Sequence, residues 1–109
     1  IRKIAQQESC IFVGRCADFV LREEDVKMLK VFVRAPVEWR IKRKMQQEHL
    51  SHDKAAHLVR KMDKRRKKYY ESYTGQIWGT PGYYDLCIDT GTTEFEEAVT
   101  TICSVYNSL

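Results

Sequence analysis

Three short apolar runs divide the chain, and none of them alternates with polar residues. They are residues 10–13 (Cys-Ile-Phe-Val), residues 31–33 (Val-Phe-Val) and the less regular residues 84–88 (Tyr-Asp-Leu-Cys-Ile). An apolar run without alternation is typical of a strand that is buried on both faces, as in the parallel sheets of α/β proteins. The sequence therefore predicts three strands of one parallel sheet.

Helical periodicity fills the segments between and around these runs. A short helix is predicted up to about Gln7 and another over residues 93–106. Pro36 suits the start of a helix, and an apolar stripe at i, i+4 and i+8 follows it: Val37, Ile41 and Met45. Ser51 is the predicted N-cap of a long helix that continues past Tyr69. The predicted buried stripe of this helix is Ala55, Leu58, Val59, Met62, Tyr69 and Tyr73. Helices that alternate with strands indicate a single α/β layer domain.

The composition fits a globular protein with an anionic partner. Of the 109 residues, 43% are apolar and 11% aromatic, which is enough for a core. No apolar run approaches the roughly 20 residues of a membrane span, and the four cysteines form no CxxC pair, which favours a reducing, cytoplasmic compartment. The net charge is +4, but seven of the nine residues 60–68 are basic. This concentration of charge favours nucleotide phosphates or nucleic acid as a partner.

Arg66 is the residue whose predicted position most strongly indicates a functional role. At 100° per residue it falls on the apolar stripe of the long helix, between Met62 and Tyr69. A guanidinium on such a face needs an anion, because an unpaired charge is costly to desolvate. A carboxylate such as Asp63 would give Arg66 a structural role, as would extension of the side chain into solvent. A phosphate group would give it a functional role, because phosphate oxygens suit the planar guanidinium.

Arg15 is a second candidate, because it directly follows the predicted strand at residues 10–13. In open parallel sheets, ligands bind beyond the carboxyl ends of the strands. The alternative for Arg15 is a structural ion pair with Asp18. Arg34, at the end of the next predicted strand, is a weaker candidate for which a surface role is the favoured interpretation.

Arg40 and Arg43 lie on one face of the helix that follows Pro36. This helix and the long helix could close over a common anion, although a basic helix face is more often simply solvated. The histidines lack the i, i+4 spacing of a metal-binding helix, and no metal site is predicted from His49, His52 and His57. An aromatic-rich stretch predicts the end of a core more readily than a base-stacking surface: Tyr69, Tyr70, Tyr73, Trp78, Tyr83 and Tyr84.

Five segments form an ordered set along the chain. They are residues 11–18 (Ile-Phe-Val-Gly-Arg-Cys-Ala-Asp), 31–36 (Val-Phe-Val-Arg-Ala-Pro), 40–43 (Arg-Ile-Lys-Arg), 63–70 (Asp-Lys-Arg-Arg-Lys-Lys-Tyr-Tyr) and 84–88. In this order and spacing they resemble the C-terminal half of the cytidylate kinase-like family. The resemblance implies the P-loop nucleoside-monophosphate kinase fold, a three-layer parallel sheet with helices on both faces that is incomplete in this chain. Residues 1–109 would be the C-terminal part of one such domain, with residues 37–70 as a lid-like, mobile helical segment.

The resemblance also implies an activity, the transfer of the γ-phosphoryl group of ATP, with Mg²⁺, to CMP, dCMP or a similar small acceptor. Arg15 and Asp18 would bind the acceptor, and the catalytic Arg40, Arg43 and Arg66 would screen the charge of the transferring group. The implied partners are the nucleotide substrates and either an N-terminal segment of the same protein or a second copy. Such a partner would fill a gap in the sheet between residues 10–13 and 31–33. No membrane partner is expected.

Two features depart from the family pattern. The chain has Gly-Arg-Cys-Ala-Asp where cytidylate kinases have Gly-Arg-Asp, which leaves the acceptor open. No G-x-x-x-x-G-K-[ST] loop occurs in the 109 residues, so this chain alone is expected to be inactive. Two alternatives stay open: a non-enzymatic nucleic-acid-binding module that uses the basic helix 60–68, which is less favoured, and a regulatory relative that binds nucleotide without turnover.

Overall fold

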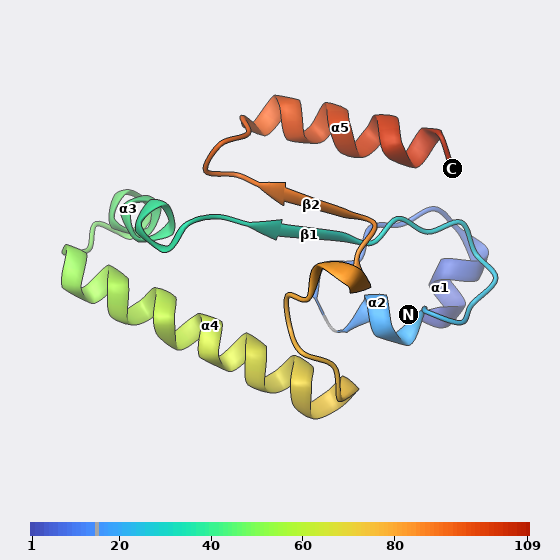
Figure 1. Ribbon diagram of the computed structural model, residues 1–109, viewed down its shortest axis with the longest axis horizontal. Helices are drawn as coiled ribbons and strands as arrows, with labels where there is room; N and C mark the ends of the chain where they lie inside the picture. Colours follow the sequence, from blue (N-terminus) through green and yellow to red (C-terminus); the bar gives the residue numbers. More distant parts are fainter. Residues whose placement is uncertain (15) are drawn as a thin grey trace.

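A computed structural model describes residues 1–14 and 16–109 and shows helices arranged around a small parallel sheet (Figure 1). The elements in chain order are α1 (Arg2–Gln7), α2 (Ala17–Val20), β1 (Val31–Arg34), α3 (Val37–Glu48), α4 (His52–Thr74), the 3-10 helix η1 (Pro81–Tyr83), β2 (Leu86–Asp89) and α5 (Phe95–Asn107). The two strands pair in parallel, with Val31 opposite Leu86 and Arg34 opposite Asp89. Parallel pairing needs a long crossover, and α3 and α4 provide it. The carboxyl ends of both strands point toward α3 (Figure 1).

The sheet confirms the α/β class but is smaller than the sequence predicts. The strands expected at residues 31–33 and 84–88 are present as β1 and β2. The prediction of a strand at residues 10–13 is wrong. The chain forms no strand there, and Ile11 and Val13 are 91% and 88% exposed. Apolar side chains favour a strand, but a strand also needs a neighbour for its backbone hydrogen bonds. Within residues 1–14 and 16–109 the sheet has two strands, and the predicted three-layer fold, of which this chain would hold an incomplete part, stays a prediction.

The helices α3 and α4 form a hairpin whose ends follow the local sequence. Ser51 is the N-cap of α4 as predicted, and its Oγ accepts a hydrogen bond from the backbone nitrogen of Lys54 at 3.3 Å. Pro36 was predicted to be the first residue of α3 but occupies its N-cap position, so the helix begins one residue later, at Val37. Gly75 ends α4 with φ at 73°, a left-handed conformation that glycine adopts readily. These local signals fix where the hairpin turns and where it stops.

The inward face of α4 differs from the predicted stripe in its second half. Ala55 and Val59 are buried as predicted, but Tyr69 and Tyr73 are 51% and 62% exposed. Tyr70 is the buried tyrosine instead, with 6% of its surface exposed. Adjacent tyrosines lie 100° apart on a helix, so either face could be apolar, and tertiary contacts to distant residues select Tyr70.

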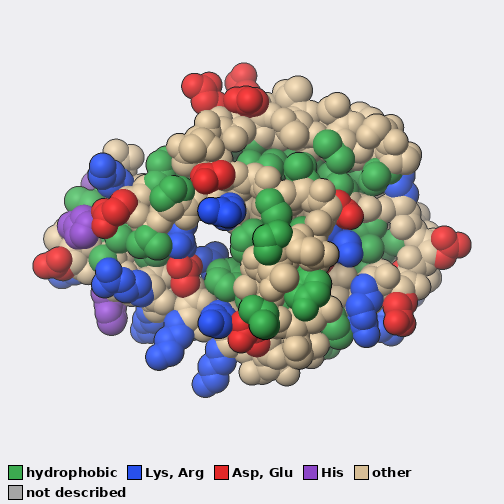
Figure 2. Space-filling model, viewed as in Figure 1, with side chains coloured by type: hydrophobic (Ala, Val, Ile, Leu, Met, Phe, Trp, Pro, Cys, Tyr) green, Lys and Arg blue, Asp and Glu red, His purple; other side chains and the backbone are tan. Residues whose placement is uncertain are grey.

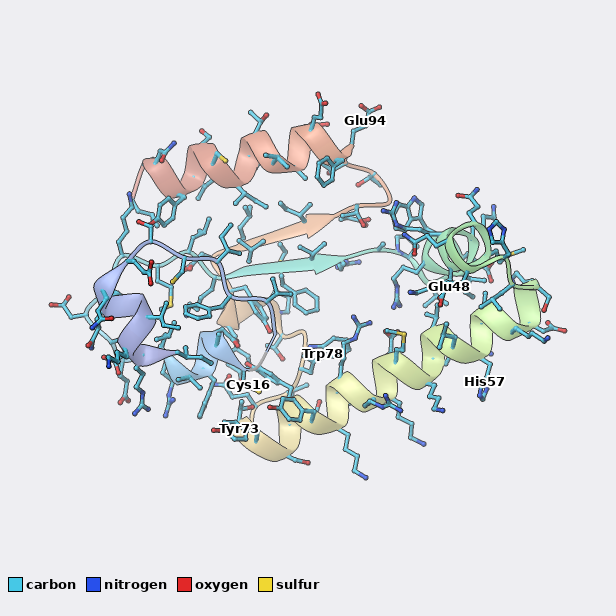
Figure 3. The ribbon with its side chains drawn as sticks, turned by 180° about the vertical axis from the view of Figure 1, so that it is seen from behind. Cys16, Glu48, His57, Tyr73, Trp78 and Glu94 are labelled. Atoms are coloured by element: carbon cyan, nitrogen blue, oxygen red, sulfur yellow. The ribbon has the colours of Figure 1, made fainter. Side chains whose placement is uncertain are left out.

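The segment after β2 ties the two strand ends together and leads into α5. The backbone nitrogen of Thr90 donates a hydrogen bond to the carbonyl oxygen of Arg34 at 2.8 Å, just beyond the last paired residues. Helix α5 then runs back beside β2, while α4 lies on the other side of the sheet (Figures 1 and 3). None of the helices in the described part of the chain is long and apolar enough to cross a membrane.

Candidate functional site

A hollow of about 280 Å³ lies where α3 and α4 diverge from their shared apolar core. Ile41, Ala55, Ala56 and Val59 form that core and are almost completely buried. Both helices contribute basic residues to the lining of the hollow. The apolar packing of α3 on α4 therefore brings these residues together. The lining residues are Trp39, Arg40, Arg43, Lys44, Gln47, Val59, Met62, Asp63 and Arg66.

Asp63 joins the two arginines that face each other across the hollow. Nη1 of Arg40 lies 2.7 Å from Oδ1 and 2.8 Å from Oδ2 of Asp63, and Nη2 of Arg66 donates to Oδ1 at 2.5 Å. Nε of Arg40 also donates to the carbonyl oxygen of Ala35 at 3.1 Å, which ties the site to the end of β1. The side chains of Arg40 and Asp63 are about three-quarters buried, whereas that of Arg66 is 55% exposed. The expectation that Arg66 sits on a buried stripe is therefore wrong, and its carboxylate partner Asp63 is present.

Aromatic rings hold two of the arginines in defined orientations. The guanidinium carbon of Arg66 lies 5.6 Å from the centre of the Trp78 ring, and that of Arg43 lies 5.4 Å from the Trp39 ring. Both distances suit cation–π attraction. Trp78 in turn packs edge-on against Phe32 of β1, with ring centres 5.9 Å apart. Arg66 is thus connected to the sheet through an aromatic pair that links positions far apart in the sequence.

The arginines keep donors available for a ligand. A guanidinium carries five N–H donors, and the described contacts of Arg40 use its Nε and Nη1 while those of Arg66 use its Nη2. No ion pair is recorded for Arg43 in the part of the chain that the structure describes. Figure 2 shows an opening between the hairpin and the rest of the molecule, with Lys and Arg side chains at its rim. The arrangement can therefore bind a multiply charged anion such as a phosphoryl group.

Asp18 lies in a separate cluster, at the far end of α4. Its Oδ2 accepts a hydrogen bond from the hydroxyl of Tyr70 at 2.9 Å, one helical turn beyond Arg66. Burial raises the pKa of the Tyr70 hydroxyl, and the hydrogen bond to Asp18 and the negative charge of that residue raise it further. Burial, followed by the negative charge of Asp18, raises the pKa of the Cys16 thiol. Figure 3 shows Cys16 close to the end of α4 that carries Tyr73.

The structure brings together three of the predicted site residues: Arg40, Arg43 and Arg66. Asp18 is not among the residues that line their hollow. Arg15 lies outside the described residues. Arg34 is an exposed residue at the end of β1, in agreement with its favoured surface interpretation.

Two residues, Tyr70 and Trp78, were not predicted from the sequence as neighbours of Arg66. Tyr70 follows Arg66 by four residues, a spacing that places both on one helix face, and this signal was available in the sequence. The contact with Trp78 had no comparable signal, because it depends on how the loop after Gly75 folds back over α4.

Comparisons with known proteins show the family of this chain. The model of the cytidylate kinase-like family matches residues 1–92. The chain belongs to the cytidylate kinase-like family. A cytidylate kinase of Methanopyrus kandleri is 29% identical over 96 residues, which cover 82% of this chain and 50% of that protein. The crystal structure of an uncharacterized protein from Eubacterium ventriosum matches with a TM-score of 0.92 and 33% identity, over 99% of this chain and 61% of that one. The chain thus spans about half to three-fifths of the length of these relatives.

The chemistry of the described residues bears on whether they could contact ATP and Mg²⁺. The three arginines fit phosphate oxygens, since they are cationic, partly oriented by aromatic rings and at the rim of an opening. Among residues 1–14 and 16–109, no group of three or more His, Cys, Asp or Glu side chains is placed to hold a metal ion. The three arginines are therefore suited to phosphate oxygens, and the described residues form no dedicated cluster of metal ligands.

Proposed function

We propose that the protein containing this chain transfers the γ-phosphoryl group of ATP to CMP, dCMP or a similar small acceptor. The observation that carries the proposal is the convergence of Arg40, Arg43 and Arg66 on one hollow, in a chain of the cytidylate kinase-like family. An oxygen of the acceptor phosphate forms a new bond to the γ-phosphorus, the bond from that phosphorus to the bridging oxygen breaks, and ADP leaves with the electron pair.

The arginines contribute by positioning and by charge. The phosphoryl group carries its negative charge on three equatorial oxygens in the transition state, and oriented guanidinium donors stabilise that charge without reorganising. Asp63 holds Arg40 and Arg66 in place and leaves their other donors for the substrate. Arg43, oriented by Trp39, supplies further donors from α3. The donor phosphates and any metal ion would require residues beyond these three arginines and Asp63.

Arg66→Ala in the full-length protein tests this proposal. We expect kcat for ATP-dependent phosphorylation of CMP or dCMP to fall about a thousandfold or more, the scale of removing an arginine that stabilises a phosphoryl group. Product nucleotides separated by chromatography give the rates, with UMP and AMP as alternative acceptors. Arg60→Ala is the matched control, because Arg60 is an exposed arginine of α4 that does not line the hollow. It should leave kcat within about twofold, as expected for a surface charge.

Two results would contradict the proposal. One is the absence of transfer to all four acceptors by the wild-type protein. The other is an Arg66→Ala variant that is as active as Arg60→Ala. Tight binding of single-stranded oligonucleotides that weakens steeply with salt would instead favour the nucleic-acid-binding alternative. The exposed, stacked rings of Tyr69 and Tyr73, with centres 6.3 Å apart, would be the surface for it.

A further inference from the structure

Tyr70 is a buried polar residue on a helix whose neighbouring tyrosines are exposed. It is 6% exposed, and its hydroxyl oxygen lies 2.9 Å from Oδ2 of Asp18 and 3.0 Å from Oε1 of Gln76. A phenol has one proton to donate, and the carboxylate of Asp18 is the stronger acceptor. If the side-chain amide of Gln76 is turned by 180°, its NH₂ group donates a hydrogen bond to the oxygen of the same hydroxyl. The two orientations of the amide differ only in the assignment of its oxygen and nitrogen.

This hydrogen bond joins two elements that are distant in the sequence. Asp18 belongs to α2, and Tyr70 is separated from it by 52 residues. The first half of α4 packs on α3 through the apolar core of the hairpin. The second half carries hydrogen bonds to α2 and to the loop after Gly75. Besides Tyr70, Oε2 of Glu71 accepts a hydrogen bond from the backbone nitrogen of Trp78 at 3.1 Å.

The position of Tyr70 matters because of what lies one turn before it. Four residues along a helix give a rise of about 6 Å and a return to the same face. Arg66 therefore sits one turn before Tyr70 on the same side of α4, where its side chain remains 55% exposed. A roll of α4 about its axis would move Arg66 away from Trp78 and from the hollow. The hairpin core and the Arg40–Asp63 ion pair hold α4 as far as Asp63, but beyond it the cation–π contact with Trp78 is too weak by itself to prevent a roll of the helix end.

We propose that Tyr70 is a positioning residue, whose hydrogen bond to Asp18 fixes the rotation of α4 and so holds Arg66 at the phosphoryl-binding hollow. Asp18 then acts through Tyr70 and not as the ligand of the acceptor that the sequence predicts. The inference rests on the proposed phosphoryl transfer for its catalytic consequence. Its structural part, the anchoring of α4, is independent of that activity.

A double-mutant cycle in the full-length protein tests the catalytic consequence. Tyr70→Phe removes the hydroxyl and Asp18→Ala removes the acceptor, so each should lower kcat about ten- to a hundredfold with the KM for CMP within about twofold. The double variant should be no worse than the worse single variant, because both changes break one contact. Asp18→Asn keeps an acceptor oxygen and should restore most of the activity. Tyr69→Phe is the matched control, since it removes the hydroxyl of an exposed neighbour, and should match the wild type.

Three kinetic results would overturn the proposal. Tyr70→Phe could match the wild type while Asp18→Ala raises the KM for CMP, which would make Asp18 a substrate ligand. The two effects could be additive, which would make them independent. Asp18→Asn could be as impaired as Asp18→Ala, which would show that the charge of Asp18 and not its acceptor oxygen is needed.

Amide hydrogen exchange separates a failure of this proposal from a failure of the proposed function. We expect the amides of residues 66–74 to exchange about tenfold faster in Tyr70→Phe than in the wild type and in Tyr69→Phe, because the anchor is local. Unchanged exchange would overturn the anchor even in an active enzyme. If the wild-type protein transferred no phosphoryl group but Tyr70→Phe accelerated exchange, the proposed function would fail and the anchoring of α4 would stand.

Discussion

The two halves of α4 are held by contacts of different kinds. The first half buries Ala55, Ala56 and Val59 against Ile41 of α3, in a small core that is closed within the hairpin. The second half buries little apolar surface and is held by hydrogen bonds and aromatic contacts, centred on Tyr70 and Trp78. Burial of apolar groups is not directional, whereas a hydrogen bond requires a defined distance and angle.

This difference suggests a division of tasks along one helix. The apolar half keeps α3 and α4 together as a unit, and the polar half sets how that unit sits relative to the sheet. The residues that line the hollow come from both α3 and α4. Their positions relative to one another therefore depend on the first half of α4, which packs on α3. Their position relative to the sheet depends on the second half of α4. The interpretation of residues 37–70 as a lid stays a prediction.

Among the substitutions that test the difference between the two halves of α4, Ile41→Ala is expected to have the largest effect on stability. Ile41 is fully buried in the hairpin core, and removing a buried Ile side chain costs about 2–5 kcal/mol of stability. Because the core is local to the hairpin, exchange of the amides of α3 and the first half of α4 should accelerate more than exchange in β1. Ile77→Ala makes the same chemical change at a side chain that is 67% exposed, and should leave exchange unchanged. Equal acceleration in hairpin and sheet would show that the two regions unfold as one.

Local patterns predict the hairpin well, and contacts between distant residues explain what they miss. The cap at Ser51, the stop at Gly75 and the burial of Ile41 follow from signals within a few residues. The strands at residues 31–33 and 84–88 are recognised by their apolar runs, but the equally apolar residues 10–13 form none. A run of side chains says nothing about whether a neighbouring strand is present to pair with it.

In the candidate site, too, some features could be predicted from local patterns and others could not. The convergence of Arg40, Arg43 and Arg66 could be predicted, because helix periodicity and the family resemblance both point to it. The choice of Tyr70 over Tyr69 as the inward residue could not, since it depends on an acceptor 52 residues away. The exposed setting of Arg66 could not be predicted either, because helix periodicity places a residue on a face but does not show what covers that face.

A smaller effect is expected from Gly91→Ala, which tests how the hairpin joins the sheet. A Cβ at Gly91 would lie 2.7 Å from Cδ of Pro36 and 3.1 Å from Oδ1 of Asp89. Neither ring nor carboxylate can give way freely, because Pro36 leads into α3 and Asp89 accepts a hydrogen bond from the nitrogen of Gly91. Overpacking of this kind costs about 1–3 kcal/mol, and thermal unfolding of the protein measures it. Gly82→Ala is the matched control, because its Cβ would meet no atom within 4 Å. Equal unfolding temperatures for the two variants would show that the junction at Pro36 is loose.

The smallest effect is expected from Ser51→Ala, which weakens the apolar half of α4 without touching its core. The Oγ of Ser51 accepts the otherwise unpaired backbone N–H of Lys54, and loss of such a cap costs about 1 kcal/mol. Ser72→Ala is the matched control in the second half, where Ser72 is an exposed interior residue of the same helix. Alanine is the better helix former there, so this change should stabilise slightly, by less than about 0.7 kcal/mol. Chemical denaturation should therefore give opposite signs for the two variants. A Ser51→Ala variant as stable as Ser72→Ala would mean that the first turn of α4 is already frayed, and that the hairpin depends on its apolar core alone.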